Sequence, residues 1–228
     1  MASYVGFPFD GLFTSEEMID NVTSFPGSVP GTMIWRDVNG DGTMTEDVMA
    51  PNGDYVILGD AYPDFTFSFQ NTLRIGDFDI RALLNGEFGS TNIRSEWITT
   101  YRNIDGLFNV DAEYVENFWR SRSNPGDGLT PTPIGGATPR QQYRDTQSSV
   151  WLWDASHIWL RDLTVRYNLG GALEGASIYA TGSNLFVLSP YPSNPDATDL
   201  DDASNSPGRD DGNYPVPRRF TVGIDLSF

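Results

Sequence analysis

The sequence has no cysteine, which excludes a disulfide framework and any thiolate metal site. Basic residues are also scarce, with 14 Lys and Arg against 31 Asp and Glu and a formal net charge of -17. A chain this acidic repels nucleic acid, and no basic patch offsets the repulsion, so we expect no nucleic-acid partner.

Long apolar runs are missing too. No stretch approaches the roughly 18–20 residues of a membrane helix. The first residues, 1–6, have neither the basic nor the apolar region of a signal peptide. Membrane β-strands escape such a search, because only alternate residues face lipid. For a barrel protein, the missing signal peptide predicts that the chain is a fragment.

Aromatic residues are plentiful at 13 %, and they lie in runs separated by Gly, Pro, Asn and Asp. This composition is typical of strands joined by turns and long loops, and it argues against disorder. The sequence therefore predicts an all-β fold.

The last eleven residues, 218–228, alternate most strictly. One face carries apolar side chains at every second position from Phe220 to Phe228, and the other carries Thr, Gly, Asp and Ser. This period of two predicts a strand with one apolar face and one polar face. The inner face of a soluble β-sandwich would look similar, so this segment alone leaves both alternatives open.

Four further antiparallel strands are expected, and one of them contains an irregularity. A hairpin joins residues 65–75 to residues 78–85 through a minimal Gly76-Asp77 turn. A third strand is expected over 150–167, where the apolar parity changes, and a bulge near Arg161-Asp162 would reconcile the two halves. A fourth strand follows over 177–188.

The connections between these strands alternate in length. The connections after the first and third strands are short, whereas residues 90–149 and 189–216 form long connections. Bacterial outer-membrane barrels alternate short periplasmic turns with long extracellular loops. We therefore predict antiparallel strands of a transmembrane β-barrel: an extracellular loop region at 1–63, and about five C-terminal strands with two long extracellular loops at 64–228.

Five segments stand out, in order along the chain: FDGLF at 9–13, GDAYPDF at 59–65, WDASHIWLRDLTVRY at 153–167, SIYATGSNL at 177–185 and YPVPRRFTVG at 214–223. They resemble segments of the SusC-like (SusC/RagA) family of TonB-dependent outer-membrane receptors. Each segment is modest alone, but together they span nearly the whole chain.

The resemblance implies import across the bacterial outer membrane. Members of the family pair a plugged barrel of about 22 strands with a SusD-like surface lipoprotein, and they take up glycans or peptides with energy from the TonB complex. This chain lacks the plug and the TonB-contacting segment, and about five strands cannot close a barrel. We therefore expect that the isolated chain does not transport. The alternative is a secreted, calcium-stabilised β-sandwich that binds carbohydrate.

One acidic segment, DVNGDGTMTED at 37–47, resembles an EF-hand calcium loop. The candidate ligands are side-chain or carbonyl oxygens of Asp37, Asn39, Asp41, Thr43 and Asp47. Val48 occupies the position of the usual final carboxylate, so the loop is also compatible with an Asx-rich turn held by its own hydrogen bonds. Calcium is the one cofactor that the sequence suggests.

Catalysis is not indicated. The sole histidine, His157, lies within an expected strand, and the sequence shows no nucleophile elbow or phosphate loop. A second acidic run is expected to be a solvated loop, and exposed loop aromatics are the candidates for glycan contact. The acidic residues are Asp196, Asp199, Asp201, Asp202, Asp210 and Asp211, and the aromatic residues are Trp97, Tyr101, Trp119 and Tyr143. The sequence therefore predicts a receptor and not an enzyme.

Overall fold

The computed structural model describes residues 3–94, 112–132, 148–170, 175–191, 208–210 and 216–226. Contacts divide the chain into two compact units. The small-sheet unit comprises described residues within Met1–Ala61, Ile93–Leu152 and Arg209–Gly212. The long-strand unit comprises described residues within Tyr62–Asn92, Trp153–Gly208 and Asn213–Phe228.

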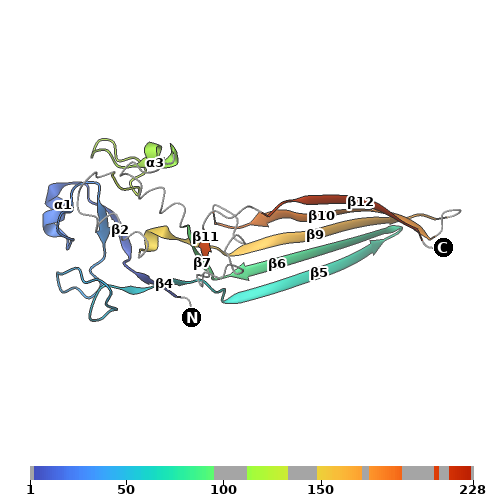
Figure 1. Ribbon diagram of the computed structural model, residues 1–228, viewed down its shortest axis with the longest axis horizontal. Coiled ribbons are helices and arrows are strands. Elements are labelled where there is room, and N and C mark those ends of the chain that lie inside the picture. The colour runs from blue at the N-terminus through green and yellow to red at the C-terminus, as the bar shows by residue number, and fades with distance from the viewer. Residues whose placement is uncertain are drawn as a thin grey trace. The chain divides into compact units, whose positions relative to one another are not determined.

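The long-strand unit is one antiparallel sheet of five strands in the order β12-β10-β9-β6-β5 (Figure 1). The strands are β5 (Phe65–Ile75), β6 (Phe78–Phe88), β9 (His157–Asn168), β10 (Ala176–Leu188) and β12 (Arg219–Leu226). All four strand pairs are antiparallel, which confirms the fold class expected from the sequence.

Register keeps the apolar residues of all five strands on one face. Ile75 lies opposite Phe78, Phe78 opposite Tyr167, Tyr167 opposite Ile178, and Ile178 opposite Ile224. Residues one position away in each strand lie on the opposite face, because side chains alternate along a strand. Each strand thus contributes to an apolar face and to a polar face.

A bulge in β9 preserves this separation of the faces. The β6–β9 register shifts where Leu83 pairs with Asp162 and Leu84 with Leu160, so Arg161 is the extra residue. The β9–β10 register shifts at the same level, and there Asn184 adopts a positive φ of 53°. The bulge expected near Arg161-Asp162 is therefore confirmed, and it places Leu160 and Leu163 on the same face.

The strand expected over 150–167 was too long. Ser149–Trp151 forms a 3-10 turn (η3), Leu152–Asp154 forms the short strand β8, and β9 begins only at His157. The Asp154 carboxylate accepts a hydrogen bond from the Ser156 backbone N–H at 2.8 Å. This side chain supplies a local partner to the backbone in place of a sheet partner, which interrupts the strand.

The small-sheet unit contains two two-stranded sheets and two short helices. Strands β1 (Ser3–Gly6) and β4 (Val56–Asp60) pair, as do β2 (Phe9–Leu12) and β3 (Met33–Trp35). The helices are α1 (Glu16–Asn21), which begins at an N-cap hydrogen bond to Ser15, and α3 (Ala112–Asn117). No described helix is long and apolar enough to cross a membrane.

A third small sheet has the order β11-β7-β8, in which β11 (Arg209–Asp210) runs parallel to β7 (Thr91–Arg94). The long connection expected over 90–149 is therefore not wholly irregular, since it contains β7 and α3.

The core of the small-sheet unit is aromatic. Phe7 is fully buried, and its ring contacts the rings of Phe25, Trp35 and Tyr55 at centroid separations of 5.6, 5.9 and 4.7 Å. Two of these contacts are edge-to-face, which is a favourable arrangement for aromatic pairs.

Candidate functional site

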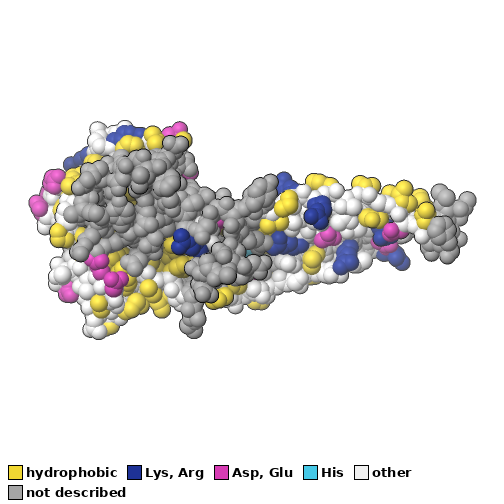
Figure 2. All heavy atoms as spheres, in the orientation of Figure 1, with side chains coloured by type: hydrophobic (Ala, Val, Ile, Leu, Met, Phe, Trp, Pro, Cys, Tyr) yellow, Lys and Arg dark blue, Asp and Glu magenta, His cyan; other side chains and the backbone are white. Residues whose placement is uncertain are grey.

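The apolar face of the long sheet is largely uncovered. Fifteen large apolar side chains of its five strands are exposed, and all lie on this face. They are Phe65, Phe69, Leu73, Ile75, Phe78, Phe88, Val165, Tyr167, Ile178, Phe186, Leu188, Phe220, Val222, Ile224 and Leu226. In β12, Val222 and Ile224 expose 76 % and 66 % of their surface. The space-filling view shows yellow hydrophobic side chains at the surface along the strands (Figure 2).

Exposure on this scale is incompatible with a water-soluble surface. Full burial of one such side chain contributes about 1.5–3 kcal/mol, so fifteen of them need an apolar environment. A soluble sandwich would cover this face with a second sheet, but in the part of the chain that the structure describes no second sheet covers these side chains. The sandwich alternative is therefore not favoured.

The opposite face carries polar side chains in rows that run across the strands. One row, which we call the arginine row, joins Arg74, Asp79, Arg166, Tyr179 and Gly223 as successive register partners. The next row, which we call the hydroxyl row, joins Thr72, Arg81, Thr164, Thr181 and Thr221 in the same way.

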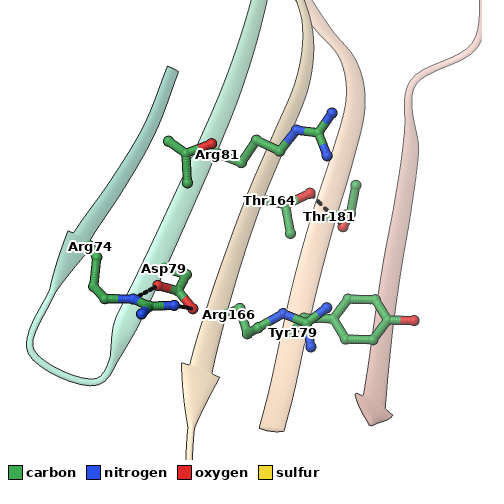
Figure 3. A pocket seen from close by; sticks show the side chains of 8 residues that line it. Arg74, Asp79, Arg81, Thr164, Arg166, Tyr179 and Thr181 are labelled. Atoms are coloured by element: carbon green, nitrogen blue, oxygen red, sulfur yellow. Dashed lines mark hydrogen bonds and ion pairs between the residues drawn. The ribbon is translucent and has the colours of Figure 1, made fainter. Parts of the chain in front are cut away.

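Ion pairs hold the arginine row. The Arg74 guanidinium donates through Nε and Nη2 to both carboxylate oxygens of Asp79, with an Nη2–Oδ2 distance of 3.1 Å (Figure 3). The Asn168 amide donates to the same carboxylate at 2.9 Å. Two-point contact fixes the guanidinium more firmly than a single bond does.

Arg166 has a different set of partners. Its guanidinium donates to the Asp225 carboxylate and, at 2.7 Å, to the Ser177 hydroxyl, and it lies 5.2 Å from the centre of the Tyr179 ring. The Tyr179 ring in turn lies over Gly223, where an added Cβ would stand only 2.4 Å from ring atoms. A side chain at this position would require the Tyr179 ring to move, because the ring occupies the space of a Cβ.

The hydroxyl row contains one cation and no carboxylate. Thr164 and Thr181 bond to each other through their hydroxyls at 2.9 Å. Arg81 donates to the Gln70 amide oxygen at 3.2 Å and, among the described residues, makes no ion pair. In Figure 3 the Arg74–Asp79 pair is joined by a dashed line, whereas Arg81 is joined to no other drawn side chain.

The two rows together line a concavity of about 610 Å³ on the polar face. Its lining residues are Thr72, Arg74, Asp79, Arg81, Thr164, Arg166, Tyr179 and Thr181. They supply guanidinium and hydroxyl donors but no nucleophile held by a base. The surface can therefore bind polar and anionic groups. Residue-by-residue sequence reading missed this site because its lining residues come from four strands, although the alternation of each strand assigns every one of them to the polar face.

The loop at 37–47 is a network of side-chain-to-backbone hydrogen bonds. The Asp37 carboxylate accepts the backbone N–H groups of Gly40 and Gly42 at 2.7 and 2.9 Å and the Thr23 hydroxyl at 3.1 Å. Desolvation acts to raise the pKa of Asp37, but these donors outweigh it and hold that pKa below its usual value. Asp41 likewise accepts the Thr43 backbone N–H at 2.8 Å.

The fully buried Asp54, which lies outside residues 37–47, binds the backbone of this loop. Its carboxylate accepts the backbone N–H groups of Val38 and Thr45 at 2.8 and 2.7 Å. Asp47 adopts a positive φ of 57°, and it lies close enough to Tyr55 that burial and this neighbouring charge together raise the Tyr55 pKa to about 12.

Asp37, Asn39, Asp41 and Thr43 thus lie together in one turn. Among the described residues no three His, Cys, Asp or Glu side chains gather in a metal-binding arrangement, but Asn and carbonyl oxygens are also calcium ligands. The calcium site stays a prediction.

Two expectations about loop residues were wrong. Trp119 is buried, with 8 % exposure, and packs against Gly31, so it cannot be an exposed contact for glycans. Asp210 is also buried, with 1 % exposure in β11, and is not part of a solvated run. The other members of both sets lie outside the described residues.

Known proteins match this chain along its whole length. TonB-dependent receptor P3 of Formosa agariphila is 27 % identical over 241 residues, and TonB-dependent receptor P26 of the same organism is 29 % identical over 245 residues. The matches cover 100 % and 99 % of this chain but 22 % of each relative, so the chain spans about a fifth of their length. No protein-family model matches.

The fold matches solved structures of the RagAB peptide importer. Its open-open state superposes with a TM-score of 0.67 at 18 % identity, covering 99 % of this chain and 22 % of the other. Its closed-closed state gives 0.67 at 19 % identity, with coverages of 99 % and 23 %. These likenesses establish the fold.

Sheet architecture and comparisons lead to one class of protein. A sheet with an exposed apolar face and a polar face, similar to the barrel of these importers, is part of the wall of a transmembrane β-barrel. More specifically, the chain is similar over its whole length to TonB-dependent receptors, in agreement with the resemblance carried by the five sequence segments. The relatives are receptors and transporters, not enzymes.

Proposed function

We propose that this chain forms part of the wall of an outer-membrane receptor that imports nutrients. In this proposal the apolar face contacts the hydrocarbon core of the outer membrane, and the polar face lines the barrel interior. The observation that carries it is the segregation of fifteen exposed large apolar side chains onto one face of a sheet whose other face carries ion pairs and hydroxyls.

The orientation follows from the ends of the strands. Gly76, with a positive φ of 59°, allows the short turn between β5 and β6, and such short turns lie on the periplasmic side of bacterial barrels. The loop region at 1–63 and the long connections within 64–228 would then lie outside the cell. In this proposal the calcium-type loop belongs to the extracellular part, where millimolar calcium would suit a weak site.

We infer that import requires more strands than the described long sheet contains. Its five strands leave two sheet edges, and unpaired backbone groups in lipid cost several kcal/mol each, so this sheet alone would not form a pore. We propose that transport belongs to a longer receptor that supplies the remaining strands, a plug and the contact with the TonB complex. The length of the relatives, of which this chain spans 22 %, supports this proposal.

The cargo and partner are proposed by analogy with the relatives. RagAB is a peptide importer, and its two-component name supports a SusD-like surface lipoprotein as the partner of the present receptor. Peptides or glycans are the cargo class. Tagging the longer receptor and identifying the lipoprotein that co-purifies with it would test the partner. Recovery of the intact receptor without any lipoprotein would contradict it.

The placement of the two faces can be tested with a matched pair of cysteines. The chain has no cysteine, so Val222→Cys and Thr221→Cys each create the one thiol within it, and these neighbours point to opposite faces of β12. Any cysteine elsewhere in the longer receptor is first replaced by serine. In the longer receptor reconstituted in bilayers, we expect a fluorophore on V222C to be quenched by nitroxide lipids. A water-soluble thiol reagent should modify T221C instead.

The outcome that contradicts the proposal is equally clear. If both thiols react equally with the water-soluble reagent, and neither label is quenched by lipid, the apolar face does not contact the membrane. Far-ultraviolet dichroism of both variants, compared with the unmodified receptor, verifies that each has retained its β-structure.

A further inference from the structure

The polar face contains a cation that has no counter-ion on the sheet. The arginine row has two guanidinium groups, Arg74 and Arg166, and each is paired with a carboxylate, Asp79 or Asp225. In the hydroxyl row, Arg81 bonds only to the neutral Gln70 amide among the described residues. The three guanidinium groups line the same concavity, so it carries one unbalanced positive charge.

The neighbours of Arg81 in register are hydroxyl groups. Thr72 lies opposite it on β5 and Thr164 opposite it on β9, and the row continues through Thr181 and Thr221. Of these, Thr164 and Thr181 bond to each other. A guanidinium presents several N–H donors in a planar fork that matches a carboxylate, and a hydroxyl can donate to the same group.

On the other side of the hydroxyl row from Asp79, one acidic side chain, Asp162, is already engaged. The Asp162 carboxylate accepts the hydroxyls of Thr164 and Ser183 at 3.1 and 3.3 Å. Its negative charge, two residues from Thr164 along β9, disfavours a dianion at Arg81 but tolerates a monoanion. A single carboxylate is therefore a better ligand than a phosphate dianion.

We propose that Arg81 and the neighbouring threonines of the hydroxyl row form a carboxylate-binding site. The proposal depends on the proposed function, because the barrel interior is what would enclose the site and reduce its competition with bulk water. The carboxylate has two possible sources. One is an acidic side chain from a part of the receptor outside this chain, and the other is a carboxylate of a peptide or acidic sugar inside the barrel. In either case Arg81 is a binding residue.

Chemical modification separates the two sources. The longer receptor in detergent is treated with phenylglyoxal, which modifies accessible guanidinium groups, and the rate at Arg81 is read by peptide mass spectrometry. With an internal carboxylate, we expect at least about tenfold slower modification than at Arg219, with the protection removed at 1 M NaCl. With a free ligand, Arg81 should react rapidly in salt-free buffer and be protected by acetate.

Two results would overturn the proposal. One is protection that salt does not remove, which would indicate simple steric burial. The other is rapid modification that acetate does not slow more at Arg81 than at Arg219. Arg219 is a suitable reference because it also belongs to the polar face and has no ion pair among the described residues.

Variants test the role of the planar Arg81 guanidinium. In the free-ligand case, Arg81→Gln should weaken acetate binding by about tenfold. The binding is measured by the acetate-dependent shift of the threonine resonances of the hydroxyl row. Arg81→Lys should restore part of it, because the charge remains while the two-point geometry is lost. In the internal case, R81Q should lower the receptor's unfolding midpoint, whereas Arg219→Gln should leave it unchanged. Equal effects of R81Q and R219Q would contradict a local site.

The cysteine-pair experiment keeps the two proposals separate. If the V222C label is quenched by lipid, but Arg81 shows neither salt-sensitive protection nor protection by acetate, only the carboxylate-site proposal fails. If V222C is not quenched, the membrane placement fails, whatever the reactivity of Arg81.

Discussion

The two units of this chain treat the same kind of residue in opposite ways. In the small-sheet unit, Phe7, Phe13 and Trp35 expose 0, 1 and 4 % of their surface and form an interior. In the long-strand unit, Phe65 and Phe220 expose 59 and 74 %. The comparison shows that apolar alternation specifies a face but not the medium that covers it. That medium follows from whether a second layer of the fold is present.

The largest expected effect tests the interior of the small-sheet unit. Phe7→Ala removes a fully buried ring that contacts three other aromatic rings, and it should cost about 3–5 kcal/mol of local stability. Hydrogen exchange of the receptor should show faster exchange at Trp35 and Tyr55 and unchanged exchange in β12. Unchanged exchange at Trp35 would mean that this aromatic cluster does not hold the unit together.

The next effect tests the apolar face. Ile224→Lys should cost about 2–4 kcal/mol if the residue faces the bilayer centre. Thr221→Lys, on the polar face of the same strand, should cost within about 0.5 kcal/mol. Urea unfolding in lipid vesicles measures both values. Equal costs for the two lysines would remove the distinction between the faces.

A smaller effect tests calcium. If the loop at 37–47 binds calcium, a free concentration of ten times Kd should stabilise the small-sheet unit by about 1.4 kcal/mol. Asp37→Asn should abolish the calcium-dependent stabilisation of this unit. Magnesium at the same concentration should not replace calcium. Calorimetry that detects no calcium-specific heat at millimolar ion would leave the loop as an Asx-rich turn.

The smallest effect concerns pH. The folded pKa of Asp37 is depressed, so its contribution to stability is fully present above the unfolded pKa of about 3.9. That contribution is lost as the pH falls below this value and through the folded pKa. We expect the unfolding midpoint of D37N to fall less between pH 5 and 3 than that of the unmodified chain. Identical pH profiles would show that the Gly40 and Gly42 hydrogen bonds do not stabilise the charged form.

The alternation of apolar and polar residues along each segment predicted most strands of the long sheet. The strict period of residues 220–228 identified β12, and the change of parity between Leu160 and Leu163 located the bulge at Arg161. These features could be read because side-chain direction in a strand depends only on position along it. The break before His157 was missed because one carboxylate, that of Asp154, replaces a sheet partner for the backbone.

Pairing between distant strands could not be read in this way. The arginine and hydroxyl rows depend on register between β6 and β9, where Arg81 meets Thr164 across more than eighty residues of sequence. The small-sheet unit was equally hidden, since Trp119 and Asp210 come from segments with no strong period and are buried by tertiary contacts. Burial of a loop residue depends on the rest of the fold and not on its neighbours in sequence.

The single-residue bulge at Arg161 has a consequence for how such a protein can change over evolution. Loss or gain of one residue within a strand would move every following side chain of that strand to the opposite face of the sheet. A change of two residues would leave each side chain on its original face. Length variation among homologous strands should therefore occur in even steps or be accompanied by a compensating bulge. The connecting loops, which have no such parity, are free to vary by any number.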